Sequence, residues 1–134
     1  MKFIVGIFFM LHGLVHIWYV VLSQRLVEFQ PDMGWTGESW LLTPLIGDSV
    51  TRALATGLYL LATLGFVAAA LAVFTEQAWW SQAAIVAAVF SAVVILLFWD
   101  GGMQMLMQRG LLGLLIDVAI VVALAVLDWP SLGF

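Results

Sequence analysis

The sequence predicts an all-α integral membrane protein, built as a bundle of four transmembrane helices. Of its 134 residues, 65% are apolar and 9% are charged, whereas a typical soluble domain has about 45–50% apolar and about 25% charged residues. A chain of this length buries too small a fraction of its surface to hide so much apolar area from water. Its apolar residues form continuous runs and do not alternate like the lipid-facing strands of a barrel.

Four apolar runs are long enough to cross the hydrocarbon core of a bilayer, which takes about 20 helical residues. The expected spans are residues 3–22, 53–74, 78–99 and 110–127. They occupy most of the chain, so a single transmembrane domain covering residues 1–134 is expected. The first run is too long for the apolar core of a signal peptide, which favours a retained helix.

The connections between the expected spans differ in length. Residues 75–77 form a tight turn, whereas residues 23–51 form a long first loop with a turn-forming cluster at residues 30–34. Residues 39–42 favour a short helix at the membrane surface, so the long loop is expected to be interfacial. Four spans joined in this way predict an up-down-up-down topology.

Lysine and arginine give a small preference for one orientation. Arg25, Arg52 and Arg109 lie in loops on one side of the expected bundle, and Lys2 lies on the other. Positively charged loops tend to stay in the cytoplasm, which places both termini outside. The expected location is the bacterial cytoplasmic membrane.

Composition excludes several classes of function. The chain has no cysteine, which removes disulfides, zinc fingers, iron–sulfur clusters and thiol nucleophiles. Four Lys and Arg against eight Asp and Glu leave no basic surface for nucleic acid. The sequence also contains no P-loop, nucleophile elbow or Gly-rich dinucleotide loop.

Three ionisable residues fall inside the expected spans, namely His12, His16 and Asp117. A charged group at the centre of a membrane helix costs about 2.5–3.5 kcal/mol on insertion scales, so each is a functional candidate by default. The i,i+4 spacing puts both histidines on one face of one helix. An ionised Asp117 needs a partner away from lipid. We therefore expect a contact between these histidines and Asp117 that joins the first and fourth spans.

Two imidazoles and one carboxylate are candidates to bind a metal or another cofactor. A 2-His-1-carboxylate set suits non-haem iron and is also found at catalytic zinc. A divalent metal and a tetrapyrrole bound by a single histidine are both compatible with His12, His16 and Asp117. The structural alternative is that both histidines are neutral and hydrogen-bonded to other helices, and that Asp117 is protonated and donates to a backbone carbonyl.

Polar residues of the second span form one stripe, spaced as i, i+4, i+7 and i+11: Arg52, Thr56, Tyr59 and Thr63. With Ser91 of the third span, this stripe could line a polar cavity open toward the long loop. Thr56 and Tyr59 are therefore additional candidates for binding a cofactor. The alternative is that the threonines bond the carbonyls of their own helix.

Residues near the third loop suggest two further interpretations. Asp100 and Arg109 are most simply solvated interfacial charges. Met103, Met105 and Met107 could ligate a soft metal through their thioether sulfurs.

Three functions fit these observations. The first is binding of a small apolar molecule, metal or cofactor at an intramembrane site between the first and fourth spans, with His12, His16 and Asp117 as candidate binding or catalytic residues. The second is an accessory subunit of a larger membrane complex. The third is a proton or ion pathway through the same residues.

Expected partners are the lipid bilayer, a second copy of the chain or a larger complex, and an apolar small molecule. Whether the protein is an enzyme is left open.

Overall fold

The computed structural model describes all 134 residues as helices and connecting loops, with no β-strand. The long helices are α1 (Lys2–Ser23), α3 (Asp48–Phe74), α4 (Trp80–Leu97) and a last helix with α5 (Leu112–Val121) at its centre. This last helix begins with the π-helical turn η2 (Met107–Leu111) and ends with η3 (Val122–Val126). By length and hydropathy, four helices can cross a membrane. The all-helical class and the four long apolar helices are thus confirmed.

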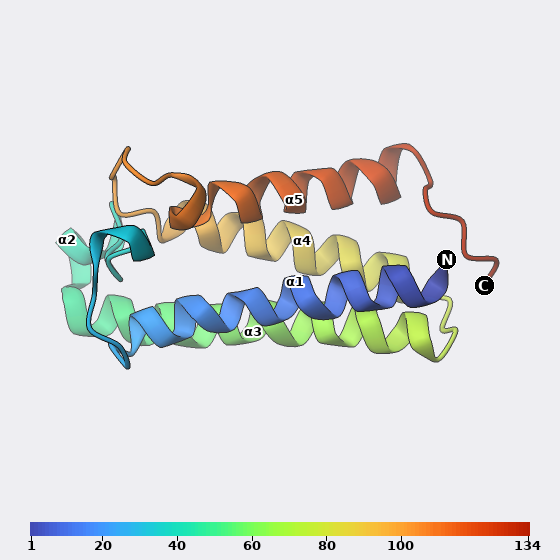
Figure 1. Ribbon diagram of the computed structural model, residues 1–134, viewed down its shortest axis with the longest axis horizontal. Coiled ribbons are helices and arrows are strands. Elements are labelled where there is room, and N and C mark those ends of the chain that lie inside the picture. The colour runs from blue at the N-terminus through green and yellow to red at the C-terminus, as the bar shows by residue number, and fades with distance from the viewer.

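The long helices pack in the order in which they occur in the chain. Helix α1 packs against α3, α3 against α4, and α4 against α5. Helices α1 and α5 have no comparable backbone contact with each other. Figure 1 shows both chain termini at one end of the molecule, with α2 (Leu42–Ile46) and the long first loop at the other end.

The helix bounds differ from the predicted spans mainly at α3, which begins at Asp48 and not at residue 53. Gly47 immediately before it has φ 85°, a backbone conformation that suits glycine and ends the preceding helix. Asp48 then accepts a hydrogen bond from Arg52 Nε at 3.0 Å. An acidic side chain in the first turn also interacts favourably with the helix dipole.

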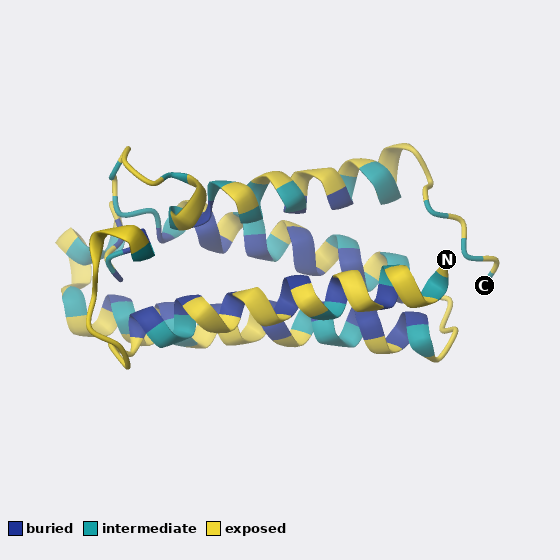
Figure 2. Ribbon diagram, viewed as in Figure 1, coloured by how far each residue is buried: buried dark blue, intermediate teal, exposed yellow.

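Small residues bring α1 and α3 close together. A Cβ atom at Gly13 would lie 2.8 Å from Phe66 Cβ and 3.2 Å from the Thr63 carbonyl oxygen. Figure 2 shows the buried residues on the inward faces of the helices and the exposed residues on the outward faces. These outward faces carry many large apolar side chains, such as Leu61 and Val93.

The first loop folds back over one end of the bundle and buries Trp35 with 1% of its surface exposed. The Trp35 ring packs edge-on against Tyr19 and Tyr59, at centroid distances of 5.9 and 5.6 Å. Nearby, the Asp100 carboxylate accepts hydrogen bonds from the Thr36 backbone N–H at 3.1 Å, the Thr36 hydroxyl and the Gly102 backbone N–H, and pairs with Arg109.

The Asp100–Arg109 pair corrects the expectation of solvated charges. The side chains of Asp100 and Arg109 are 2% and 14% exposed. The interpretation was wrong because the first loop returns to cover this pair, and a contact between segments so far apart in the chain leaves no local signal. The buried pair connects the first loop to the start of the last helix.

Replacing Gly13 with alanine is expected to destabilise the protein by about 1–3 kcal/mol, because overpacking forces neighbouring atoms to shift. Phe66 Cβ lies next to the backbone and cannot move alone. Gly57→Ala is the matched control, because a Cβ at Gly57 meets nothing within 4 Å. Unfolding in mixed detergent micelles, followed by helical circular dichroism, measures both variants. Equal stability of the two variants would contradict the close α1–α3 packing.

Candidate functional site

Both histidines lie on the inward face of α1 and are buried, with 6% of His12 and 2% of His16 exposed. The i,i+4 spacing aligns them one turn apart, and their ring centroids are 5.3 Å from each other. Phe66 of α3 packs edge-on against His12 at a centroid distance of 4.6 Å. The close α1–α3 packing therefore holds both imidazoles inside the bundle.

Asp117 lies on α5 and is completely buried. Gly113, one turn earlier, lets α5 approach α4, since a Cβ there would lie 3.2 Å from Ile95 Cδ1. Gly110 also faces Ile95 and has φ 118°, a conformation that few residues other than glycine adopt. The glycines that precede Asp117 thus bring its carboxylate into the bundle interior.

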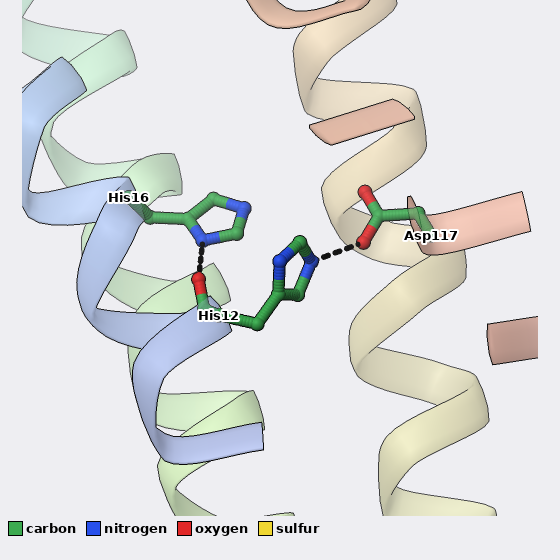
Figure 3. Close-up of side chains that lie close together, drawn as sticks. All are labelled: His12, His16 and Asp117. Atoms are coloured by element: carbon green, nitrogen blue, oxygen red, sulfur yellow. Dashed lines mark hydrogen bonds and ion pairs between the residues drawn. The ribbon is translucent and has the colours of Figure 1, made fainter. Parts of the chain in front are cut away.

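The expected contact between the first and fourth spans is present. His12 Nε2 and Asp117 Oδ1 are 2.8 Å apart, and Figure 3 shows the two side chains extending toward each other from opposite helices. His16 makes different contacts. Its Nδ1 lies 3.0 Å from the His12 carbonyl oxygen, and its Nε2 lies 2.7 Å from Ser91 Oγ. The carbonyl can only accept, so Nδ1 carries the proton, and a neutral His16 accepts the Ser91 hydroxyl through Nε2.

Asp117 leaves one polar atom without a partner. Its Oδ2 is buried and makes no hydrogen bond, although buried polar atoms in proteins are nearly always paired. The alternative in which Asp117 donates to a backbone carbonyl is not seen, because Oδ1 is hydrogen-bonded to His12 and Oδ2 has no hydrogen-bond partner. The hydrogen bonds of both histidines to other helices do match the structural alternative.

The three residues also satisfy a geometric condition for binding a metal. One potential ligand atom from each of His12, His16 and Asp117 lies within 4.8 Å of the others. Each residue offers a nitrogen or oxygen donor of the kind used by zinc and non-haem iron.

A cavity of about 580 Å³ lies beside the two histidines, between α1 and α5. Its walls are mainly apolar and include Val15 and Trp18 from α1, Ile95 from α4, and Leu112 and Ile116 from α5. The first loop and η2 supply Asp32, Met33, Met107 and Gln108. Asp32 and Gln108 at this end were not identified from the sequence, because no periodicity relates loop residues to a helix face.

The threonines of the predicted polar stripe lie outside the cavity lining. Thr56 accepts from Gln24, shares a hydrogen bond with Ser23 and donates to the Arg52 carbonyl. Thr63 donates to the Tyr59 carbonyl at 3.1 Å, so both threonines follow the alternative of bonding their own helix.

Tyr59 stacks on Tyr19 at 4.8 Å and lies 6.2 Å from His16, in each case between ring centroids. Neither Thr56 nor Tyr59 lines the cavity. All three methionines are exposed, and of them only Met107 lines the cavity.

Comparisons with known proteins assign no family to this chain. No family model, curated protein or solved structure matches it. The geometry of the site is therefore the basis for a proposed function.

Replacing Ser91 with alanine is expected to lower the free energy of unfolding by about 0.6–1.7 kcal/mol, because it leaves His16 Nε2 without its partner. Ser81→Ala on the same helix is the control. The Ser81 hydroxyl bonds only the adjacent Gln82 side chain at an exposed position, and such substitutions usually change stability by less than about 0.5 kcal/mol. Chemical unfolding in mixed micelles compares the two. If Ser91→Ala is as stable as Ser81→Ala, the His16–Ser91 bond contributes nothing.

Proposed function

We propose that this protein crosses a membrane four times in up-down-up-down order and binds a small, largely apolar molecule in the cavity between α1 and α5. The observation that carries this proposal is an apolar-walled cavity of about 580 Å³ with His12 and His16 in its lining. Ligand sites in proteins typically have about 300–1,000 Å³ and mostly apolar walls with a few polar groups that orient the ligand.

The outward faces of the helices support insertion into a bilayer. Large apolar side chains such as Leu11, Leu61 and Leu115 are more than half exposed, and a lipid environment removes the cost of this exposure to water. The two termini lie at the same end (Figure 1), as expected for four crossings. Arg25, Arg52 and Arg109 favour the opposite end as the cytoplasmic one, with the bacterial cytoplasmic membrane as the proposed location.

The chemistry of the lining indicates a class of ligand. Most of the wall offers only dispersion and apolar contact, which suits a hydrocarbon or aromatic body. His12 and His16 provide the polar groups near mid-membrane depth. A molecule with an apolar body and one hydroxyl, carbonyl or ring nitrogen would satisfy both parts of the cavity.

The seam between α1 and α5 provides a route from the bilayer. These helices lack close backbone contact, so the seam is covered mainly by side chains. A second apolar groove of about 510 Å³ follows the same seam toward the termini, and Ile116 lines both spaces. A ligand with a long chain could place its polar group near His12 and its chain in this groove.

Filling the cavity is expected to reduce retention of the bound molecule several-fold. Val15→Trp places a large ring in the cavity, because Val15 is part of its lining. Leu14→Trp adds similar bulk at the neighbouring position on α1, which is outside the lining. Mass spectrometry of organic extracts of the purified proteins, quantified per mole of protein, measures retention. Equal retention by both variants, or no specific molecule in the wild type, would reject the proposed cavity.

A further inference from the structure

We propose that His12, His16 and Asp117 bind one divalent transition-metal ion of the zinc or iron(II) type, and that the ion faces the cavity. The role of the cavity in this inference rests on the proposed function, since the bound small molecule would take an open coordination position. Binding of the ion itself depends only on the three side chains.

The donor set selects the class of metal. Two imidazole nitrogens and one carboxylate oxygen form the ligand set of many catalytic zinc sites and of non-haem iron(II) sites, both of which leave positions open for water or substrate. Soft Cu(I) favours sulfur ligands, and none of the three proposed ligands contains sulfur.

His16 is already oriented as metal-binding histidines usually are. Its Nδ1–H donates to the His12 carbonyl, and metal-bound histidines almost always use their second ring nitrogen for such a bond. This bond fixes the tautomer and leaves the lone pair on Nε2. The Ser91 hydroxyl that bonds Nε2 can turn away, because a serine in a helix can instead donate to the carbonyl of its preceding turn.

Asp117 gives a second, independent indication of a cation. Its side chain is 0% exposed, yet Oδ2 has no hydrogen-bond partner. A buried carboxylate oxygen loses its hydration, and an unpaired one has nothing to replace it. A metal ion shared with His12 and His16, and bound through both oxygens of the carboxylate, would supply the missing interaction and offset the negative charge.

The separations require only a small adjustment. Two ligands at about 2.0–2.1 Å from a tetrahedral ion lie roughly 3.3 Å apart. His12 Nε2 and Asp117 Oδ1 are separated by 2.8 Å, and the most distant of the three donor atoms lie within 4.8 Å. A pair at this 4.8 Å limit would have to approach by about 1.5 Å, which rotation of the imidazole rings and of the carboxylate about their side-chain bonds can provide.

Titration with Co²⁺ tests the site, because this ion can replace zinc and absorbs visible light when bound by nitrogen and oxygen ligands. The protein is purified in detergent without a histidine tag and treated with a chelator before titration. We expect one Co²⁺ per chain, competed by Zn²⁺. His16→Ala and Asp117→Asn should each weaken binding by at least about 10–100-fold, the loss typical even for an outer partner of a metal ligand. Asp128→Asn is the control, because Asp128 lies in the exposed C-terminal segment.

The Ser91→Ala variant distinguishes a metal site from a polar cluster that only stabilises the fold. Removing the hydroxyl frees His16 Nε2, so the affinity for Co²⁺ should be unchanged or higher, and the ion should restore stability lost by the variant. This readout uses a variant that retains all three proposed ligands.

The possible outcomes separate this inference from the proposed function. Folded wild-type protein that retains an apolar molecule but binds no Co²⁺ would overturn the metal site alone. Stoichiometric Co²⁺ binding without a retained molecule would support the metal site and reject the cavity ligand. Co²⁺ binding that is unchanged in His16→Ala and Asp117→Asn would overturn the site, and circular dichroism checks that each variant is folded.

Discussion

The hydrogen bond between His12 and Asp117 is the interaction on which the arrangement of this site depends. It joins α1 and α5, which lie at opposite ends of the packing order and lack close backbone contact. Polar contacts between membrane helices contribute about 0.6 kcal/mol on average and up to about 1.7 kcal/mol in measured cases. A bond of this size stabilises the contact only modestly, and the seam on either side of it has no close backbone contact between α1 and α5.

Helix α1 packs tightly against α3, in contrast to its lack of close backbone contact with α5. Gly13 allows α1 to approach Phe66 so closely that even one methyl group would clash. Because α1 is held on that side, the face with His12 and His16 is directed toward α4 and α5. The cavity then lies between α1 and α5, and the loop that carries the buried Trp35 folds over one end of the bundle.

The sequence predicted correctly those features for which exposure to the wrong solvent has a large free-energy cost. Continuous apolar runs identified four long helices, and the cost of ionisable groups in a bilayer singled out His12, His16 and Asp117. Their contact followed because few other groups at that depth could satisfy an aspartate. The hydrogen bond between His16 and Ser91 could not be predicted from the sequence, because it depends on how α4 is rotated relative to α1. The burial of Asp100 and Arg109 was missed because a distant loop covers them.

The second span illustrates a further limit of sequence periodicity. The predicted polar stripe comprises Arg52, Thr56, Tyr59 and Thr63. Periodicity places these residues on one helix face but does not predict what that face contacts. In the structure the two threonines bond backbone carbonyls, and Tyr59 packs against Tyr19. Threonine satisfies its hydroxyl within its own helix at little cost, so it carries a much weaker functional signal than a buried aspartate.

The energetics of the polar cluster argue that it has a role beyond holding the bundle together. An apolar contact between α1 and α5 would hold the bundle without burying a carboxylate, and replacing buried ionic groups by well-packed apolar ones is often neutral or stabilising. The structure instead places Asp117 in the interior with an unpaired oxygen, next to two imidazoles that line a cavity. In the proposed site, a bound cation would convert that unpaired oxygen into a ligand, and the cavity would give the cation access to a molecule from the bilayer.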